Sequence, residues 1–385
     1  MTPPKSAHKL SNFALFGFPL FFVCAYLLLL ISSDFYLGGN SWKQGDWLIN
    51  SNAGPTRRFL SGDLLLFLSD ITGESPLKIL VAIQSILLIA LFCSLYQLRS
   101  WLPAWLFFAF TTAPALFPAF WFADPQGSVR KELIIFFAIF LQLIAIERRS
   151  KWLIWVFVVL YAFAVFSHEA LLCFFPLILY VNYGFGKNFL SPKHLHSHST
   201  AIAFLSLSAF IFAFSFKKAV SADQVCEVLL SYNLSEEICS GAVSALDRDI
   251  KTSFRNINIW QATTNQIAVT ILCFVPILVL LWKTPERRHI FTLFIFTGAP
   301  FVALYFLGID WGRWLSFHFY SFFVAILVAT KNATIRPPQI TSRVLIFSIL
   351  IVHLVVAAPR HTMGHIKFGV LERLDNFATA IFDAI

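Results

Sequence analysis

The feature that most constrains this fold is the stretch from Ile290 to Thr330, in which Asp310 and Arg313 are the only acidic or basic residues. One membrane-crossing helix needs about 20 apolar residues, so a stretch of this length holds two. The sequence Asp310-Trp311-Gly312-Arg313 would then form a tight turn at the membrane surface. Charge is costly to place at the edge of a bilayer, so this turn is a candidate functional position.

Composition supports the same interpretation over the whole chain. Hydrophobic residues make up 58% of it and charged residues 13%, whereas soluble domains carry about 25% charged residues. We predict an all-α fold, a polytopic transmembrane helix bundle that forms a single integral-membrane domain over residues 1–385. The net charge of +9 is scattered over short loops, which argues against nucleic acid as a partner.

Eleven apolar segments are predicted as spans, and the first is expected to be an uncleaved helix. Three of them are short for a span, namely 133–146, 152–166 and 170–181. A break is expected at Ser167-His168-Glu169, because one long helix there would reverse the side of every later loop. The segments are approximately 12–32, 77–97, 102–122, 133–146, 152–166, 170–181, 201–216, 266–282, 290–309, 314–330 and 344–358.

The distribution of charge predicts a cytoplasmic N-terminus. With that orientation, 14 of the 29 basic residues fall in the short inner loops, at about twice the density of the outer regions. Among the acidic residues, only Glu147 and Glu286 would lie inside. The opposite orientation would reverse both asymmetries.

Three larger regions are then expected outside: a first periplasmic loop (33–76), a second large loop (217–265) and a tail (359–385). In the first loop, near-helical spacing of apolar residues predicts a short helix at the interface or dipping into the bundle. The tail carries an apolar stripe typical of a surface-lying amphipathic helix. The residues of the two patterns are Phe59, Leu60, Leu64, Phe67 and Leu68, and Leu371, Leu374, Phe377 and Ile381.

The second loop is expected to form a small helical cap. It holds Cys226 and Cys239, which would be able to pair in an oxidising compartment. Spacing alone does not prove a disulfide, so pairing stays open at this point.

Polar chemistry gathers at the outer ends of the helices. The guanidinium group offers a planar fork of donors suited to phosphate oxygens, and the positive-inside tendency disfavours arginine outside. Convergence on one pyrophosphate is therefore one interpretation, and local pairing, such as Asp310 with Arg313 or Glu132 with Arg130, is the other. The candidate anion-binding residues are Arg57, Arg58, Arg130, Lys131 and Arg313.

A general base would activate an acceptor hydroxyl, and four side chains compete for that role: Glu169, His168, Asp310 and Asp34. A satisfied polar turn is the alternative for the pair His168-Glu169. We expect neither a metal nor another cofactor, because no zinc-type pattern and no glycine-rich phosphate loop is found. The run His194, His196 and His198 fits a solvated cytoplasmic loop better than a metal site.

These outer motifs resemble those of bacterial polysaccharide polymerases of the Wzy type and related polytopic membrane glycosyltransferases. The likeness rests on Gly54-Pro-Thr-Arg57-Arg58-Phe-Leu-Ser-Gly62-Asp63, Arg130-Lys131-Glu132, Ser167-His168-Glu169-Ala170-Leu171 and Asp310-Trp-Gly-Arg313-Trp. A second likeness is to GT-C glycosyltransferases, which place an acid in the first outer loop. Asp34 in Asp34-Phe-Tyr36 matches that position, but the adjacent second acid is missing.

The resemblance implies transfer of a glycan from undecaprenyl pyrophosphate to a second lipid-linked unit, at the periplasmic face of a bacterial inner membrane. The partners implied are the undecaprenyl-linked donor and acceptor and the bilayer; a regulator of chain length is left open. Three other interpretations remain at this stage. They are a GT-C-type transfer of a single sugar from a polyprenyl phosphate, a lipid-linked oligosaccharide flippase, and a non-catalytic component of an envelope assembly machine. A transporter would need polar groups near mid-depth, where His318 and His353 are the main candidates.

Overall fold

The structure, a computed structural model, describes residues 17–216, 220–248, 258–282, 284–338, 347–349, 351–353, 358–361 and 366–367. Its described part is helical apart from the two-residue strands β1 (Ala358–Pro359) and β2 (Ile366–Lys367), which pair in antiparallel fashion. The longer helices are α2 (Phe18–Tyr36), α5 (Pro76–Leu98), α8 (Glu132–Glu147), α9 (Lys151–Ser167), α11 (Pro192–Ser215), α14 (Ile259–Trp282), α15 (Arg287–Leu307) and α16 (Trp311–Lys331).

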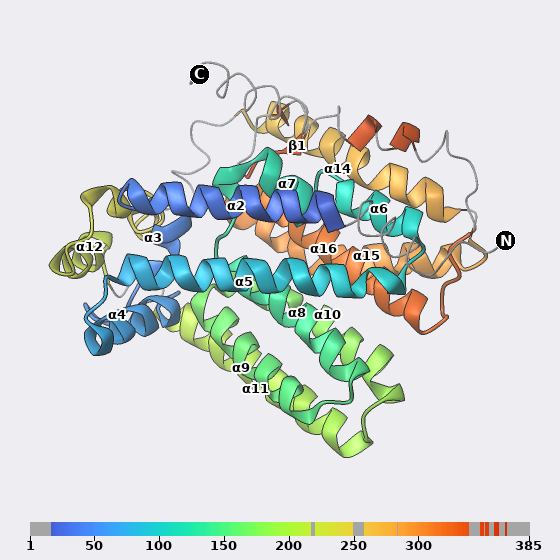
Figure 1. Cartoon of the computed structure of the whole chain (residues 1–385), viewed down its shortest axis with the longest axis horizontal. Helices are drawn as coiled ribbons and strands as arrows, with labels where there is room; N and C mark the ends of the chain where they lie inside the picture. Colours follow the sequence, from blue (N-terminus) through green and yellow to red (C-terminus); the bar gives the residue numbers. More distant parts are fainter. Residues whose placement is uncertain are drawn as a thin grey trace.

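Shorter helical elements connect or cap these. They are α3 (Lys43–Leu48), α4 (Leu60–Thr72), α6 (Ala104–Thr112), α7 (Phe117–Ala123), α10 (Phe175–Tyr180) and α12 (Ala222–Ser231). Tight 3-10 or π turns form η2 (Arg99–Trp101), η3 (Pro125–Gly127), η4 (Glu169–Phe174), η5 (Val181–Phe185), η6 (Gly186–Asn188), η7 (Glu236–Ser240) and η8 (Ser244–Leu246). Most of the long helices lie side by side along one direction (Figure 1).

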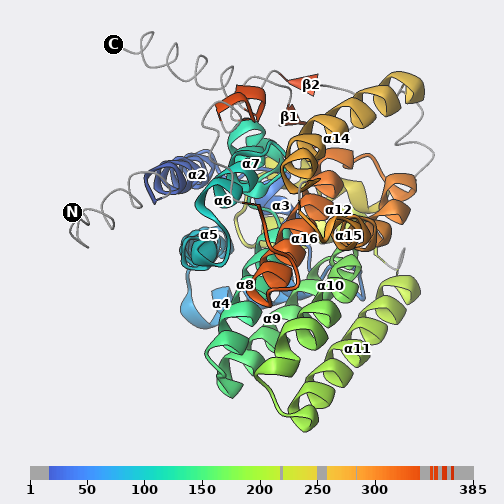
Figure 2. The same cartoon turned by 90° about the vertical axis from the view of Figure 1, so that its right-hand side faces the viewer.

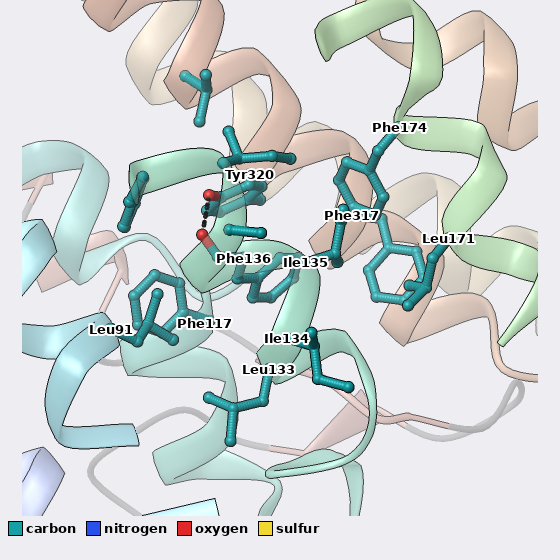
Figure 3. Close-up of a cluster of buried hydrophobic side chains, with 14 of the residues drawn as sticks. Leu91, Phe117, Leu133, Ile134, Ile135, Phe136, Leu171, Phe174, Phe317 and Tyr320 are labelled. Atoms are coloured by element: carbon teal, nitrogen blue, oxygen red, sulfur yellow. Dashed lines mark hydrogen bonds between the residues drawn. The ribbon is translucent and has the colours of Figure 1, made fainter. Parts of the chain in front are cut away.

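The centre of the bundle is built on α8 and α16, whose side chains are almost all buried. Aromatic rings fill the space between them (Figure 3). Tyr320 stacks on Phe136 with the ring centroids 4.2 Å apart, and its hydroxyl donates to the Phe136 carbonyl at 2.7 Å. That bond satisfies the one polar atom of the tyrosine in an apolar setting. The starts of α8 and α16 carry the candidate residues, so this packing fixes the two helices that position them.

The outward faces of the surrounding helices are strongly apolar. Large exposed side chains include Phe21 of α2, Ile86 of α5, Phe214 of α11, Ile271 of α14 and Phe306 of α15. A water-exposed surface of this kind would be an aggregation liability, whereas lipid tails cover it without penalty. Eight helical stretches of the described chain are long and apolar enough to cross a bilayer. The protein is thus a multi-pass membrane protein, as the composition predicted.

Two of the predicted segments take a different form in the structure. Residues 102–122 form two helices, since Pro114 forces Ala113 into an extended conformation between α6 and α7. The predicted segment 170–181 is extended by turns at both ends into a 20-residue span, Glu169–Asn188. By contrast, α8 and α9 stay short, at 16 and 17 residues. The total of eleven spans remains a prediction, because about half of residues 344–358 lie outside the described ranges. The sidedness also remains a prediction, because the spans are identified by length and composition only.

The described parts of the two predicted outer loops, 33–76 and 220–248, form short helices and turns. The apolar spacing correctly predicted α4, and helix α12 confirms the helical cap of the second loop, where Cys226 and Cys239 form a disulfide. These short helices gather at one end of the bundle, where α12, α3 and α4 lie at the left of Figure 1. The predicted amphipathic helix of the tail, with Leu371, Leu374, Phe377 and Ile381, lies outside the described residues.

Candidate functional site

The first part of the candidate site is an ion-pair group between the loop before α4 and the start of η4. Arg58 donates hydrogen bonds to both carboxylate oxygens of Glu169: Nη2 lies 2.7 Å from Oε1, and Nε lies 2.8 Å from Oε2. Arg57 Nη1 reaches the same carboxylate at 3.3 Å. These three side chains are 19–26% exposed, so the group borders the surface of the molecule.

The second part joins the starts of α8 and α16. Arg313 donates to Glu132 from Nε at 3.1 Å and from Nη2 at 2.8 Å, and its Nη1 donates to Asp310 at 2.6 Å. Arg130 approaches Asp310 from the other side at 3.8 Å. Arg313 and Glu132 are almost completely buried, whereas the Asp310 side chain is 29% exposed. The local pairing of Asp310 with Arg313 is therefore confirmed, whereas Glu132 pairs with the distant Arg313 and not with Arg130.

Lys131 and Asp46 connect the two parts. Lys131 is fully buried and donates to the carbonyl of Arg58 at 2.9 Å. Asp46 lies on α3; burial alone would raise its pKa, but the positive charges of Lys131, Arg58 and Arg313 lower the pKa to about 2. Burial lowers the pKa of Lys131 to about 8, although Asp46 opposes the shift. All five predicted cations thus belong to one connected electrostatic group.

The backbone is strained at two positions, one at a cationic residue and one next to a pair of them. Arg58 has a φ of 67° and Val129, immediately before Arg130 and Lys131, has a φ of 56°. Such values are unfavourable for residues other than glycine, and a β-branched valine tolerates them least. The Val129 carbonyl is held by Gln84 Nε2 at 2.9 Å and Trp47 Nε1 at 3.2 Å. Fixed donors from α5 and α3 therefore maintain the turn that directs Arg130 and Lys131 into the site.

A segment near the C-terminus crosses the site. A Cβ atom at Gly312 would lie only 1.7 Å from the Arg360 carbonyl oxygen, so the glycine of the turn is needed for close backbone approach. The next residue, His361, donates its backbone N–H to Asp124 Oδ2 at 2.6 Å, and its Nδ1 lies 2.7 Å from the same oxygen. Residues 360 and 361 therefore link the turn before α16 to the loop before α8.

The four predicted base candidates have different surroundings. Glu169 and Asp310 belong to the cluster and are its most exposed carboxylates. His168 Nδ1 accepts the Ala170 N–H at 3.2 Å, and burial, followed by the charge of Arg58, lowers the pKa of His168 to about 3. The histidine is therefore a neutral helix cap, and that lone pair is not free to take a proton.

Asp34 lies in a different place from the one predicted. It stands inside the last turn of α2 rather than beyond its end, because the helix continues to Tyr36. Its carboxylate pairs with Lys43 of α3 at 2.5 Å. Among the described contacts, none joins Asp34 to the arginine cluster.

Sequence reasoning missed the roles of Asp46, Glu132, Gln84 and Trp47. Their partners lie 82 residues away for Trp47 and 181 residues away for Glu132, so local spacing carries no signal for them. The signal for Asp46 is Lys43-Gln44-Gly45-Asp46, a polar stretch that belongs to the buried helix α3. Buried charges in such a place need partners, which is a usable signal.

The arrangement suits binding of an anion with several oxygens. Five cations face four carboxylates, namely Asp46, Glu132, Glu169 and Asp310, which leaves one positive charge. The neighbouring charge of Arg58 is the largest cause that lowers the pKa of Arg57, and an anion would relieve that repulsion. The Nε atoms of Arg57 and Arg130 are buried and have no hydrogen-bond partner among the described residues.

The contacts described for the other ionisable candidates lie outside this cluster. His318 contacts the Phe294 carbonyl at 3.0 Å and packs against Phe274, while His353 lies 3.4 Å from the Thr112 hydroxyl. His194, His196 and His198 lie on the first turns of α11 rather than in a loop. No group of three or more metal-ligating side chains is found within the described part of the chain.

A comparison of the chain with protein-family models, curated proteins and solved structures found no match.

Proposed function

We propose that this membrane protein is a glycosyltransferase that extends a surface polysaccharide from undecaprenyl-pyrophosphate-linked units, as an O-antigen or related polymerase of a bacterial inner membrane. The observation that carries the proposal is the convergence of Arg57, Arg58, Arg130, Lys131 and Arg313 at one end of the bundle. A pyrophosphate leaving group is a dense anion with several acceptor oxygens, and guanidinium groups bind such oxygens with two donors at once.

The transfer breaks the bond between the sugar C1 and a phosphate oxygen of the donor. A bond forms between C1 and the acceptor hydroxyl oxygen, while the hydroxyl proton passes to a carboxylate and the electron pair stays on the departing pyrophosphate. Fixed positive groups near that charge stabilise the transition state, and loss of one such donor typically costs about 3–4 kcal/mol. In this chain the guanidiniums would receive the pyrophosphate.

Two carboxylates are placed to accept the proton. Asp310 and Glu169 are partly exposed and lie among the arginines. Burial would raise the pKa of Asp310, but Arg313 and Arg130 lower it overall, so this carboxylate is ionised at neutral pH. Either group would serve as the base if the acceptor hydroxyl binds beside it.

The proposal is tested by deleting the gene and separating surface polysaccharide on a gel. Loss of long chains with retention of a single-repeat band would support a polymerase, and normal chain lengths would exclude it. Accumulation of lipid-linked units on the inner face would instead indicate a flippase.

Complementation then tests the site. Arg57→Gln and Arg58→Gln, at partly exposed positions, should leave the single-repeat band only, at normal protein levels. The matched control is Lys78→Gln, which removes an exposed outer cation whose ion pair is with Glu74. Long chains made by the arginine variants would favour a non-catalytic component.

A further inference from the structure

A cluster of phenylalanine rings lies next to the half-buried Arg57 and Arg58. It comprises Phe59 before α4, Phe166 near the end of α9, and Phe212 and Phe216 at the end of α11. Phe212 is its centre: the ring centroids lie 4.9 Å from Phe59, 6.2 Å from Phe166 and 4.7 Å from Phe216. All four rings are half-buried.

The phenylalanine cluster is close in sequence to the ion-pair group of Arg57, Arg58 and Glu169. Phe59 follows Arg58 directly, and Phe166 precedes Glu169 by three residues. The helices concerned meet here, since α4 packs on α9 and α9 packs on α11 (Figure 1). Figure 2 shows α9 and α11 together at one edge of the bundle, away from α2 and α14. The rings therefore occupy the junction between the cationic group and the outer wall of the bundle.

The two helices next to the cluster, α4 and α11, also expose large apolar side chains elsewhere along their length. Phe67 and Ile71 of α4 are 59% and 65% exposed, and Phe210 of α11 is 59% exposed. The other borders of the cationic group differ. Toward the bundle centre, α8 and α16 are tightly packed, and α3 presents the buried polar residues Lys43 and Gln44.

From this placement we infer that the phenylalanine cluster binds the hydrocarbon chain of an isoprenoid diphosphate whose phosphates contact Arg57 and Arg58. The inference rests on the proposed function and adds the side from which a lipid-linked substrate enters, between α4 and α11. Any lipid tail would contact the rings, but the adjacent guanidiniums select a tail that carries an anionic phosphate head. The aromatic rings contribute apolar contact area close to the head group.

Binding of two soluble probes tests this inference. Farnesyl diphosphate and inorganic pyrophosphate are titrated calorimetrically into the full chain in phosphatidylcholine nanodiscs, with empty discs subtracted. Burial of part of the farnesyl chain should make farnesyl diphosphate bind about tenfold more tightly than pyrophosphate. The double variant Phe59→Ser/Phe212→Ser should lose that advantage and keep the wild-type affinity for pyrophosphate.

The matched control is Phe214→Ser. Phe214 is on the same helix as Phe212, is 78% exposed and stacks on Phe210 rather than on the cluster. It should keep the farnesyl advantage. The inference would be overturned if wild-type protein bound farnesyl diphosphate no more tightly than pyrophosphate, or if the double variant still bound it more tightly. In either case, arginine-dependent binding of pyrophosphate would still support the proposed function. Absence of pyrophosphate binding would overturn both.

Discussion

Glu132 shows how much of the site depends on one buried side chain. It is 1% exposed and accepts two hydrogen bonds from Arg313, which is 4% exposed. Removing one partner of a buried pair leaves the other charge uncompensated, which costs far more than losing an exposed pair. Replacing Glu132 should therefore lower the stability of the protein.

The corresponding prediction concerns Glu132→Gln. We expect this change to lower the free energy of unfolding by about 3–5 kcal/mol, because Arg313 keeps only Asp310 as an anionic partner. The control Glu74→Gln breaks an exposed pair with Lys78 and should cost less than about 1 kcal/mol. Denaturation of the detergent-solubilised variants measures both, and equal small losses would contradict the buried pairing.

Lys131 makes anion binding depend on pH. Burial lowers the pKa of Lys131 to about 8, below the unfolded value of 10.5. As the pH rises through 8 the folded protein loses this charge, so pyrophosphate affinity should fall severalfold between pH 7 and pH 9. The free energy of unfolding should instead increase with pH between pH 8 and 10.5, because in this range Lys131 binds more protons in the unfolded chain than in the folded protein.

Calorimetric titration of pyrophosphate across this pH range tests the assignment. Lys131→Arg keeps its charge and should remove most of the pH dependence, provided that the thermal unfolding curve shows it is folded. A wild-type affinity that is flat up to pH 9 would show that Lys131 does not govern binding.

At the scale of elements, the turn before α16 depends on a contact with the C-terminal segment. Gly312→Ala would place a methyl group 1.7 Å from the Arg360 carbonyl oxygen, so the two backbones cannot keep their positions. We expect this variant to release residues 360 and 361 and to speed trypsin cleavage after Arg360. Gly184→Ala is the control, because its added Cβ would find ordinary contacts at 3.7 Å and beyond. Equal cleavage rates in the two variants would contradict the contact.

Particular elements show what the sequence could and could not predict. The apolar spacing within residues 33–76 predicted α4, because local periodicity specifies an amphipathic helix. It did not predict which face packs inward: Leu65 and Leu66 are buried, while Leu64 and Phe67 are exposed. In a membrane, apolar residues suit both lipid and core, so hydrophobicity alone does not distinguish the two faces.

For the candidate site too, the sequence indicated some residues and missed some contacts. Its arginines drew attention because they lie at turns that the charge distribution predicts to be outer, where arginine is unusual. The pairing of Glu132 with Arg313 was not, because it joins residues 181 positions apart. The placement of Asp34 was wrong because the apolar run ends before Ser32, whereas the helix continues to Tyr36 and stops at Gly38, which has a φ of 86°.

At the scale of the whole molecule, several parts of the chain contribute to one electrostatic group. The loop before α4, the loop before α8, the start of η4 and the turn before α16 bring Arg58, Lys131, Glu169 and Arg313 together at one end of the bundle. The Cys226–Cys239 disulfide belongs to the cap at that end. Such bonds persist in oxidising compartments, which agrees with the predicted outer placement of the site.

The most direct test of the account is a double-mutant cycle on pyrophosphate affinity with Arg58→Lys and Arg313→Lys. Both substitutions keep the charge and remove the planar fork of donors. If both arginines hold one anion, the losses in binding free energy should be non-additive, with a coupling energy of about 0.5–3 kcal/mol. The control Arg99→Lys, at the end of α5 that lies away from α4, should leave the affinity unchanged. Strictly additive losses, or affinity unchanged by either substitution, would contradict a single shared anion site.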